Sequence, residues 1–251
     1  MSQPVLEVSG LIKRFGGLLA TDNFSIDIRP GEVHAVIGPN GAGKTTLIGQ
    51  LIGELKADAG SIKFLGNEIS DLPVHRRSHL GLARSFQITS IFHAFTALQN
   101  VALAVQAHDG HSFRFWRPAA SDPSLTEPAM DALKLVGLEA RAHVPANALS
   151  HGEHRQLELA MALATKPKLL LLDEPMAGMG PEDSQRMVQM LLKLKGSVSI
   201  LLIEHDMEAV FALADRITVL VYGRGIATGT PDEIRRNEQV REAYLGAEAQ
   251  P

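Results

Sequence analysis

The hydrophobic positions in the first quarter of the chain fall in short runs that are rich in β-branched residues and bounded by turn residues. Runs of this kind predict β-strands. We expect strands at residues 5–8, 25–28, 33–37 and 61–65. The run at 33–37 leads directly into a glycine-rich segment, and residues 47–55 beyond it are predicted to form a helix.

The middle of the chain has a different pattern, because its apolar residues recur at the spacing of an α-helix. This spacing predicts helices within residues 97–107, 130–136 and 157–164. Between the first two, residues 108–128 contain Gly110, Pro118, Pro123 and Pro128. We interpret this stretch as a loop or a pair of short helices in an inserted helical lobe.

Strands and helices alternate again after Pro167. Apolar runs at 169–172, 198–203 and 217–221 are separated by helical patterns at 181–194 and 207–214. Apolar strands separated by helices indicate a parallel sheet that is buried on both faces. No apolar run approaches the roughly 20 residues of a membrane-spanning helix, so any membrane crossing is expected of another chain.

The composition narrows the classes of protein to consider. The chain has 251 residues, a length typical of one large domain or of one domain with an inserted lobe. Its formal net charge of −4 argues against nucleic-acid binding, which relies on clustered Lys and Arg. It has no cysteine, which excludes a disulfide framework. Residues 1–14 show no pattern of a secretory signal, so we expect none.

The glycine-rich segment after the strand at 33–37 matches the phosphate-loop pattern G-x-x-x-x-G-K-[ST]. We expect its residues to bind the phosphates of a nucleotide: Gly38, Pro39, Asn40, Gly41, Ala42, Gly43, Lys44, Thr45 and Thr46. Backbone N–H groups and the helix N-terminus would surround the phosphate oxygens. Lys44 is expected to reach the β and γ phosphates, and the Thr45 hydroxyl to ligate Mg²⁺. A glycine-rich turn without a ligand is the alternative, but the strand–loop–helix context argues against it.

Two adjacent acids follow the apolar run at 169–172. In open α/β sheets, ligands bind at the carboxyl ends of the strands, where Asp173 and Glu174 would emerge. Asp173 is positioned to hold Mg²⁺, and Glu174 to polarise the attacking water as a general base. Acids end strands often, so this pair becomes informative only together with the phosphate loop.

Further segments then follow in the order found in the ATPases of ABC (ATP-binding cassette) transporters, which the chain resembles from about residue 6 to residue 246. Gln87 stands where that family has the glutamine of the Q-loop, and 149–153 resembles its signature motif, usually L-S-G-G-Q. Residues 176–180 correspond to the D-loop, His205 to the switch histidine, and Phe15 to the aromatic residue that stacks on adenine. The resemblance implies catalytic roles for Gln87 and His205, and a role for Gln87 in the magnesium site.

The resemblance also implies a fold and a division of the chain. The fold is that of a P-loop ATPase of the α/β class, with a mainly parallel core sheet, an N-terminal antiparallel β-subdomain and an inserted helical subdomain. Residues 1–86 and 165–251 would form the nucleotide-binding core, and residues 87–164 the helical subdomain with the signature motif.

The signature segment also has the residues of a capped helix N-terminus. Ser150 is a good N-cap for a helix that begins near Gly152, and Glu153 stands at the capping-box position. Such a helix N-terminus binds anions. In ABC proteins it faces the γ-phosphate held by the opposite subunit, so Ser150 and Gly152 are expected to contact ATP in a dimer. Two departures affect this contact: His151 replaces the first signature glycine, and Gly180 replaces the usual D-loop aspartate.

Several segments are similar to the ATPase subunits of bacterial branched-chain amino acid importers: 15–20, 83–87, 177–181, 203–207 and 240–246. The insertion at 108–128 resembles the larger of the two ATPase types in those systems. The resemblance implies a second ATPase subunit, two membrane-spanning permease subunits and, indirectly, a periplasmic substrate-binding protein as partners, with the chain at the cytoplasmic face of the inner membrane. Related ATPases serve lipopolysaccharide export or the import of amides and aromatic acids, so the cargo stays open.

A soluble ABC ATPase and a non-catalytic ATP-binding scaffold are the rival hypotheses. Neither the coiled-coil insertion nor the second cassette typical of the soluble type is visible, and intact Lys44, Asp173, Glu174 and His205 argue against the scaffold.

Overall fold

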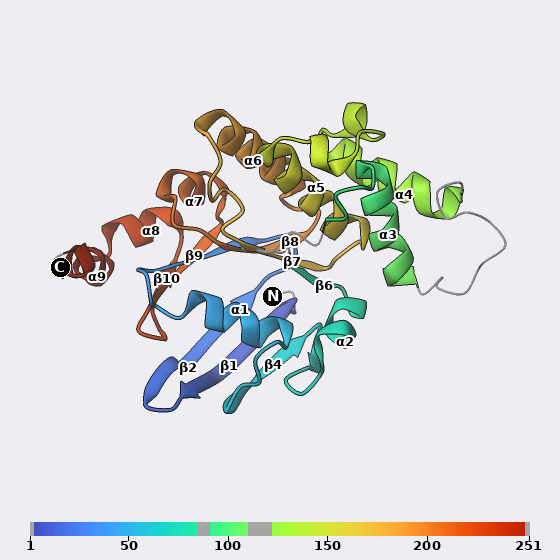
Figure 1. The fold of residues 1–251 in the computed structure, drawn as a ribbon. Helices are drawn as coiled ribbons and strands as arrows, with labels where there is room; N and C mark the ends of the chain where they lie inside the picture. The colour runs from blue at the N-terminus through green and yellow to red at the C-terminus, as the bar shows by residue number, and fades with distance from the viewer. Residues whose placement is uncertain (1–2, 85–90, 110–121, 249–251) are drawn as a thin grey trace.

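A six-stranded sheet forms the centre of the molecule in the computed structural model, which describes residues 3–84, 91–109 and 122–248 (Figure 1). Its strand order is β10-β9-β3-β8-β7-β6. The strands are β3 (Val33–Ile37), β6 (Leu82–Arg84), β7 (Leu169–Asp173), β8 (Ser199–Ile203), β9 (Arg216–Val221) and β10 (Arg224–Gly229). All neighbours are parallel except β9 and β10. The carboxyl ends of β3, β7 and β8 therefore meet at one edge of the sheet.

A second, antiparallel sheet is built from the N-terminal part of the chain, in the order β2-β1-β4-β5. Its strands are β1 (Leu6–Phe15), β2 (Leu18–Ile28), β4 (Ala59–Phe64) and β5 (Asn67–Glu68). β1 and β2 form a hairpin whose turn is Gly16 and Gly17. This confirms the expected combination of an antiparallel N-terminal sheet with a mainly parallel core sheet.

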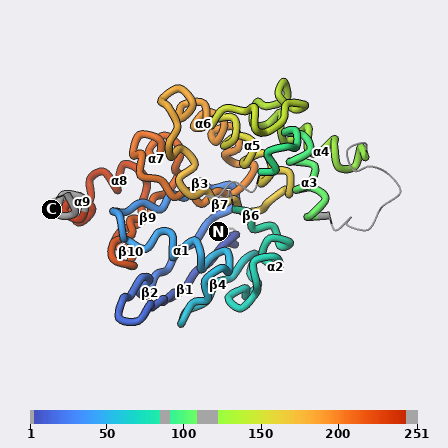
Figure 2. Tube along the Cα trace, viewed as in Figure 1, coloured from blue at the N-terminus to red at the C-terminus, as the bar shows by residue number. Residues whose placement is uncertain are grey.

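Helices cover both faces of the six-stranded sheet (Figures 1 and 2). On the side of the antiparallel sheet lie α1 (Lys44–Ile52) and α2 (Val74–His79). On the opposite side lie α3 (Ala97–Asp109), α4 (Pro123–Leu135), α5 (His151–Ala164), α6 (Pro181–Leu194) and α7 (Met207–Leu213), with 3₁₀ turns at Glu139–Arg141 and Ala146–Ala148. The chain ends in α8 (Pro231–Arg236) and α9 (Glu238–Glu248), which extend beyond β10.

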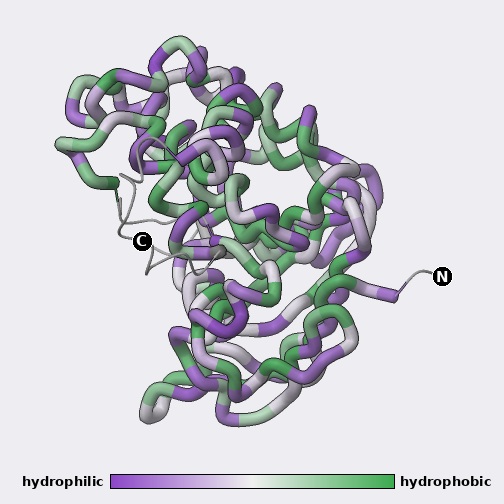
Figure 3. Tube along the Cα trace, turned by 90° about the vertical axis from the view of Figure 1, so that its right-hand side faces the viewer, coloured by the Kyte–Doolittle hydropathy of each residue, from purple (hydrophilic) through white to green (hydrophobic). Residues whose placement is uncertain are grey.

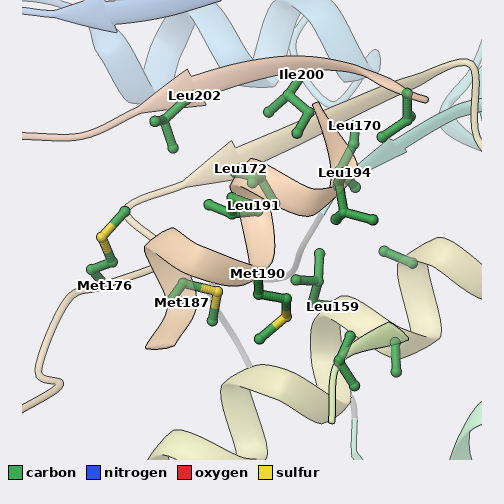
Figure 4. Packing of buried hydrophobic residues seen from close by; sticks show 14 of the residues in the cluster. Leu159, Leu170, Leu172, Met176, Met187, Met190, Leu191, Leu194, Ile200 and Leu202 are labelled. Carbon is green, nitrogen blue, oxygen red and sulfur yellow. The ribbon is translucent and has the colours of Figure 1, made fainter. Parts of the chain in front are cut away.

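The alternation of side chains along the central strands divides the core in two. In β7, Leu170 and Leu172 point to the side of α6, where they pack with residues such as Met187 and Leu191 (Figure 4). Leu169 and Leu171 point to the other side, toward the core that contains α1 and the antiparallel sheet. Figure 3 shows hydrophobic stretches running through the middle of the molecule between these layers. Burial on both faces explains why the central strands are continuously apolar.

Most of the predicted elements are present, and the differences have local causes. The stretch that was interpreted as a loop or a pair of short helices is helical from Pro123 onward, and Pro128 lies inside α4. The side chain of Asp122 accepts a hydrogen bond from the Ser124 N–H, and Pro123 stands at the first helical position, where no N–H is needed. The helix expected at 47–55 begins at Lys44 and ends at Ile52, because Gly53 takes a φ of 87°.

Six of the described strands and helices were not predicted, since they are short or lack a clear period: β5, β6, β10, α2, α8 and α9. Within the described residues, no helix combines the length and the apolar character that a membrane crossing requires.

Candidate nucleotide-binding site

The phosphate loop connects the carboxyl end of β3 to the N-terminus of α1. An added Cβ at Gly38 would lie 2.1 Å from the Leu220 carbonyl oxygen, and one at Gly43, where φ is 104°, would lie 2.3 Å from the Ala20 oxygen. Glycine is therefore required at both positions because neighbouring backbone packs against the loop. At Gly41 a Cβ would meet open space, so only its φ of 77° favours glycine.

The N-terminus of α1 is left open for an anion. Its N-cap, Gly43, supplies no side-chain hydrogen bond, and its first turn carries no acidic residue. The first N–H groups of a helix have no partner inside the helix and carry the positive end of its dipole. Such an end is suited to phosphate oxygens.

Lys44 lies at the start of α1 and its side chain folds back over the loop. Its Nζ donates hydrogen bonds to the carbonyl oxygens of Gly38 at 2.7 Å and Pro39 at 3.1 Å. Burial lowers the pKa of Lys44, and the charges of Glu174 and Asp173 partly offset this effect. The ammonium is therefore held near the phosphate-loop backbone and near both acids, as a phosphate-binding lysine requires.

Asp173 and Glu174 stand at the carboxyl end of β7 in different surroundings. The Asp173 side chain is only 4% exposed, and its Oδ2 accepts a hydrogen bond from Arg84 Nη2 at 3.0 Å. Burial raises the pKa of Asp173, although the contact with Arg84 opposes the increase. The Glu174 carboxylate is more exposed and lies 3.9 Å from Nδ1 of His205, measured at Oε1.

The backbone of Glu174 adopts a φ of 49°, in the left-handed region that non-glycine residues avoid. Its N–H donates to the Ile203 carbonyl at 2.9 Å, which keeps the turn attached to the end of β8. This conformation costs about 1 kcal/mol or more, and such strain is common in functional sites. Across this strained turn the two adjacent carboxylates lie in different surroundings.

His205 follows β8, and a buried acid fixes the backbone around it. The imidazole is 64% exposed and so is accessible to a ligand. The Glu204 carboxylate is buried and accepts hydrogen bonds from the N–H groups of Met176 at 3.0 Å, His205 at 2.9 Å and Asp206 at 3.3 Å. Glu204 thereby connects the segment after Glu174 to the histidine. We did not predict this positioning role, and the one available signal was a charged residue directly after an apolar strand.

The oxygen donors near the phosphate loop fit a magnesium ion. Thr45, in the first turn of α1, offers a hydroxyl, and Asp173 offers a carboxylate, both of which Mg²⁺ prefers as ligands. The described residues contain no cluster of three or more His, Cys, Asp or Glu that could hold a metal by themselves. Gln87, the third predicted ligand, lies outside the described residues.

Phe15 ends β1 next to the glycine turn and is 46% exposed. Lys13 Nζ lies 5.6 Å from its ring centroid. The side chain is therefore not a core residue, and part of its ring is free to stack on a base.

The signature segment forms the N-terminus of α5, on the face of the six-stranded sheet opposite α1. Ser150 Oγ accepts from the Glu153 N–H at 3.2 Å, and Glu153 Oε2 accepts from the Ser150 N–H at 2.8 Å, so the predicted capping box is present. Among the described residues, no hydrogen bond or ion pair joins Ser150 or Gly152 to the phosphate loop. One chain therefore brings together the phosphate loop, the two acids and His205, and presents the signature elsewhere.

Gly152 and the two residues that depart from the family pattern lie near the start of α5 and α6. A Cβ on Gly152 would lie 2.8 Å from Asp183 Oδ2, so a larger residue there would displace the Asp183 side chain. His151 is exposed, and Gly180 is the N-cap of α6 without a side-chain hydrogen bond. His151 thus leaves the capping box intact.

Comparison with known proteins agrees with this geometry. A family model described as ABC transporter matches residues 21–177, and one described as Branched-chain amino acid ATP-binding cassette transporter matches residues 226–250. The chain is 40% identical to the high-affinity branched-chain amino acid transport ATP-binding protein BraF of Pseudomonas aeruginosa, covering 98% of this chain and 99% of BraF. It is 38% identical to LivG of Escherichia coli, with the same description and the same coverage. A solved structure of the ADP conformation of MJ1267, an ATP-binding cassette of an ABC transporter, superposes with a TM-score of 0.85 at 30% identity, covering 98% of this chain and all of that one.

The chain belongs to the ABC transporter family and has the α/β fold of its ATPase cassettes. It is the subunit that binds and hydrolyses ATP to power transport.

Proposed function

We propose that the chain works as one half of a closed ATPase dimer, in which each ATP is held by the phosphate loop of one subunit and the signature helix of the other. The separation of Lys44 and Ser150 on opposite faces of the central sheet supports this arrangement most directly. Among the described residues, the signature segment makes no hydrogen bond or ion pair with the phosphate loop of its own chain, so its helix N-terminus would supply donors for the γ-phosphate held by a partner subunit. ATP bound across the interface would stabilise the closed dimer by mass action, and hydrolysis would reopen it.

Within each site we assign the following roles. Lys44 and the N-terminus of α1 bind the β and γ phosphates, and Phe15 stacks on the base. Glu174 polarises the attacking water, while His205, 3.9 Å away, contacts the γ-phosphate and orients that water. Thr45, Asp173 and Gln87 would hold Mg²⁺, which neutralises charge that develops on the phosphates.

We further propose that the transport driven by this ATPase is the import of branched-chain or related amino acids. The similarity to BraF and LivG, at 38–40% identity over 98% of the chain, supports this cargo. The partners would be a second ATPase subunit of the same or a related kind, two permeases and, indirectly, a periplasmic binding protein. The chain would then lie on the cytoplasmic face of the inner membrane.

A cavity of about 340 Å³ offers a place for a permease segment. It lies between α2 and β6 on one side and α3 and α5 on the other, and its walls include Val74, Ile91 and Met161. Arg84, which precedes the segment that contains Gln87, also lines it. A helix seated there would contact the elements that support the nucleotide site.

Mixing two inactive variants tests the shared site. Lys44→Ala damages the phosphate loop. For the signature we choose His151→Asp, because His151 is exposed, whereas a side chain at Gly152 would collide with Asp183. Each variant alone should be inactive. Random pairing makes half the dimers mixed, each with one intact site, so about a quarter of wild-type phosphate release should return on mixing.

Dimer formation must be demonstrated first, with the variant Glu174→Gln. This variant should bind ATP but hydrolyse it very slowly, so that the closed dimer accumulates. Its ATP-dependent dimer should appear in size-exclusion chromatography with light scattering, and only with nucleotide and Mg²⁺. If that dimer forms and mixing restores no activity, the shared-site model is wrong. Genes for two permeases and a periplasmic binding protein beside this gene would support amino acid import over export.

A further inference from the structure

Arg84 is a charged residue that touches the nucleotide site and that the sequence did not single out for chemistry. It is the last residue of β6 and pairs in register with Leu171 of β7. Its side chain is 12% exposed, and its guanidinium lies between two carboxylates. Nη2 donates to Asp173 Oδ2 at 3.0 Å, and Nη1 donates to Glu54 Oε2 at 3.1 Å.

Asp173 depends on Arg84 for its neutralisation. The charges that act on the Asp173 carboxylate come from Arg84, Glu174 and Lys44. Glu174 is negative and opposes ionisation of Asp173, and the Lys44 ammonium donates its hydrogen bonds to Gly38 and Pro39. Among the described residues, Arg84 alone forms an ion pair with the buried carboxylate. A buried carboxylate without a partner is costly, so this contact is needed when no other cation is present.

We propose that Arg84 is a positioning residue that holds Asp173 in the absence of a divalent cation and competes with that cation for the same carboxylate. The inference rests on the proposed magnesium site at Asp173. A guanidinium 3.0 Å from a carboxylate oxygen repels a second cation there, so Arg84 must shift or share the carboxylate when the metal binds. Glu54, whose side chain is 51% exposed, offers Arg84 a second partner on the solvent side.

The location of Arg84 gives this competition a further consequence. The residue also lines the cavity of about 340 Å³ between the core strands and the helices α3 and α5. It therefore contacts the metal-binding carboxylate on one side and the cavity on the other. A change in the cavity that draws Arg84 away from Asp173 would strengthen metal binding.

The affinity of the chain for a fluorescent ADP analogue, measured with EDTA and with MgCl₂, tests the proposal. The dissociation constant in EDTA divided by the dissociation constant in MgCl₂ reports how strongly the metal binds beside the nucleotide. Arg84→Gln should raise this ratio about tenfold, the typical worth of one hydrogen bond to a charged group. Arg84→Lys should restore the ratio in part, to a value between those of Arg84→Gln and the wild type, because it returns the charge without the fork of donors.

Glu54→Gln is the matched control. It removes the other carboxylate partner of Arg84 and leaves the contact with Asp173, so the ratio should stay equal to or below that of the wild type. The melting temperature gives an independent readout. Arg84→Gln should lower it in EDTA without nucleotide, and Mg²⁺ with ADP should recover most of the loss. A purely structural role would lower the melting temperature equally in both conditions.

Asp173→Asn separates failure of this inference from failure of the proposed metal site. If Asp173→Asn keeps the wild-type ratio, Asp173 is not the metal ligand and both ideas fall. If Asp173→Asn loses the magnesium effect while Arg84→Gln stays within twofold of the wild type, the metal site stands and the role of Arg84 is overturned.

Discussion

The two ends of the six-stranded sheet differ in how closely their charged side chains are paired. At the carboxyl end, the Glu174 carboxylate lies 3.9 Å from the exposed imidazole of His205 and acts on the Lys44 ammonium through its charge, and Glu174 adopts a strained backbone. At the amino end, Glu32 precedes β3 and Arg216 opens β9, and their side chains are joined at 2.5 Å. The same strands therefore carry a tightly paired end and an end at which Glu174 and His205 remain available while Asp173 is paired with Arg84.

The paired end is a network that spans both sheets. Arg216 also donates to Asp27 of β2 at 2.8 Å. His34 Nε2 lies 2.8 Å from Thr218 Oγ1, and His34 Nδ1 lies 3.4 Å from Glu32. Burial alone would raise the pKa of Glu32, but its contacts with His34, Arg216 and the Arg29 N–H outweigh burial and lower the pKa to about 2. This end contributes to stability, and the other end is free to bind a ligand.

Lys44→Ala should produce the largest effect and should show it in activity alone. Loss of the phosphate-binding charge should reduce ATP hydrolysis about 10²- to 10³-fold, as for removal of other groups that stabilise developing charge. The free energy of unfolding should change far less than the activity, because the desolvation of the buried Lys44 ammonium offsets its two hydrogen bonds to the loop backbone. Phosphate release and urea denaturation measure the two quantities. Hydrolysis near the wild-type rate would contradict the phosphate-loop assignment.

Glu32→Gln should do the reverse, lowering stability while ATP hydrolysis per folded molecule stays near wild type. The folded-state pKa of about 2 lies below the ordinary 4.5, so the ionised form stabilises the fold above pH 4.5, and this contribution is lost as the pH falls toward 2. The variant should be less stable by about 3 kcal/mol at pH 7 and by about 2 kcal/mol at pH 3.5. Urea denaturation of both proteins at the two pH values checks this. A difference that does not shrink with acid would mean that the charge of Glu32 is not the cause.

Phe15→Ala should give the smallest effect. Phe15 lies outside both ends of the six-stranded sheet, at the end of β1 in the antiparallel sheet. Base–aromatic stacking is worth about 1–3 kcal/mol, so the dissociation constant for ATP should rise about tenfold. The ring is 46% exposed, so the free energy of unfolding should hardly change. Titration of a fluorescent nucleotide measures the affinity. An unchanged dissociation constant with a clear loss of stability would place Phe15 in the core instead.

The local elements were predictable where one residue pattern determines the backbone. The strand at 33–37, the glycines after it and the capping box at Ser150 and Glu153 all appear as expected. For residues 108–128 the pattern left a loop and a pair of short helices both open, and the structure has a helix from Pro123 onward. Pro123 stands at the first helical position, where it favours a helix, and α4 buries Leu125, Ala129 and Leu133 in the core although Pro128 lies inside it.

The sequence by itself determined the family, the phosphate loop, the two acids after the apolar strand and the capped helix, because each depends on neighbouring residues in one short segment. Only the tertiary structure decided which segments meet. Arg84 reaches Asp173 across 89 positions of sequence, and Glu204 joins Met176 across 28. These contacts arise because parallel strands bring their carboxyl ends to one edge, and no local pattern records which charged residue will face which. For the same reason, only the folded chain shows that Ser150 and Lys44 lie on opposite faces of the sheet.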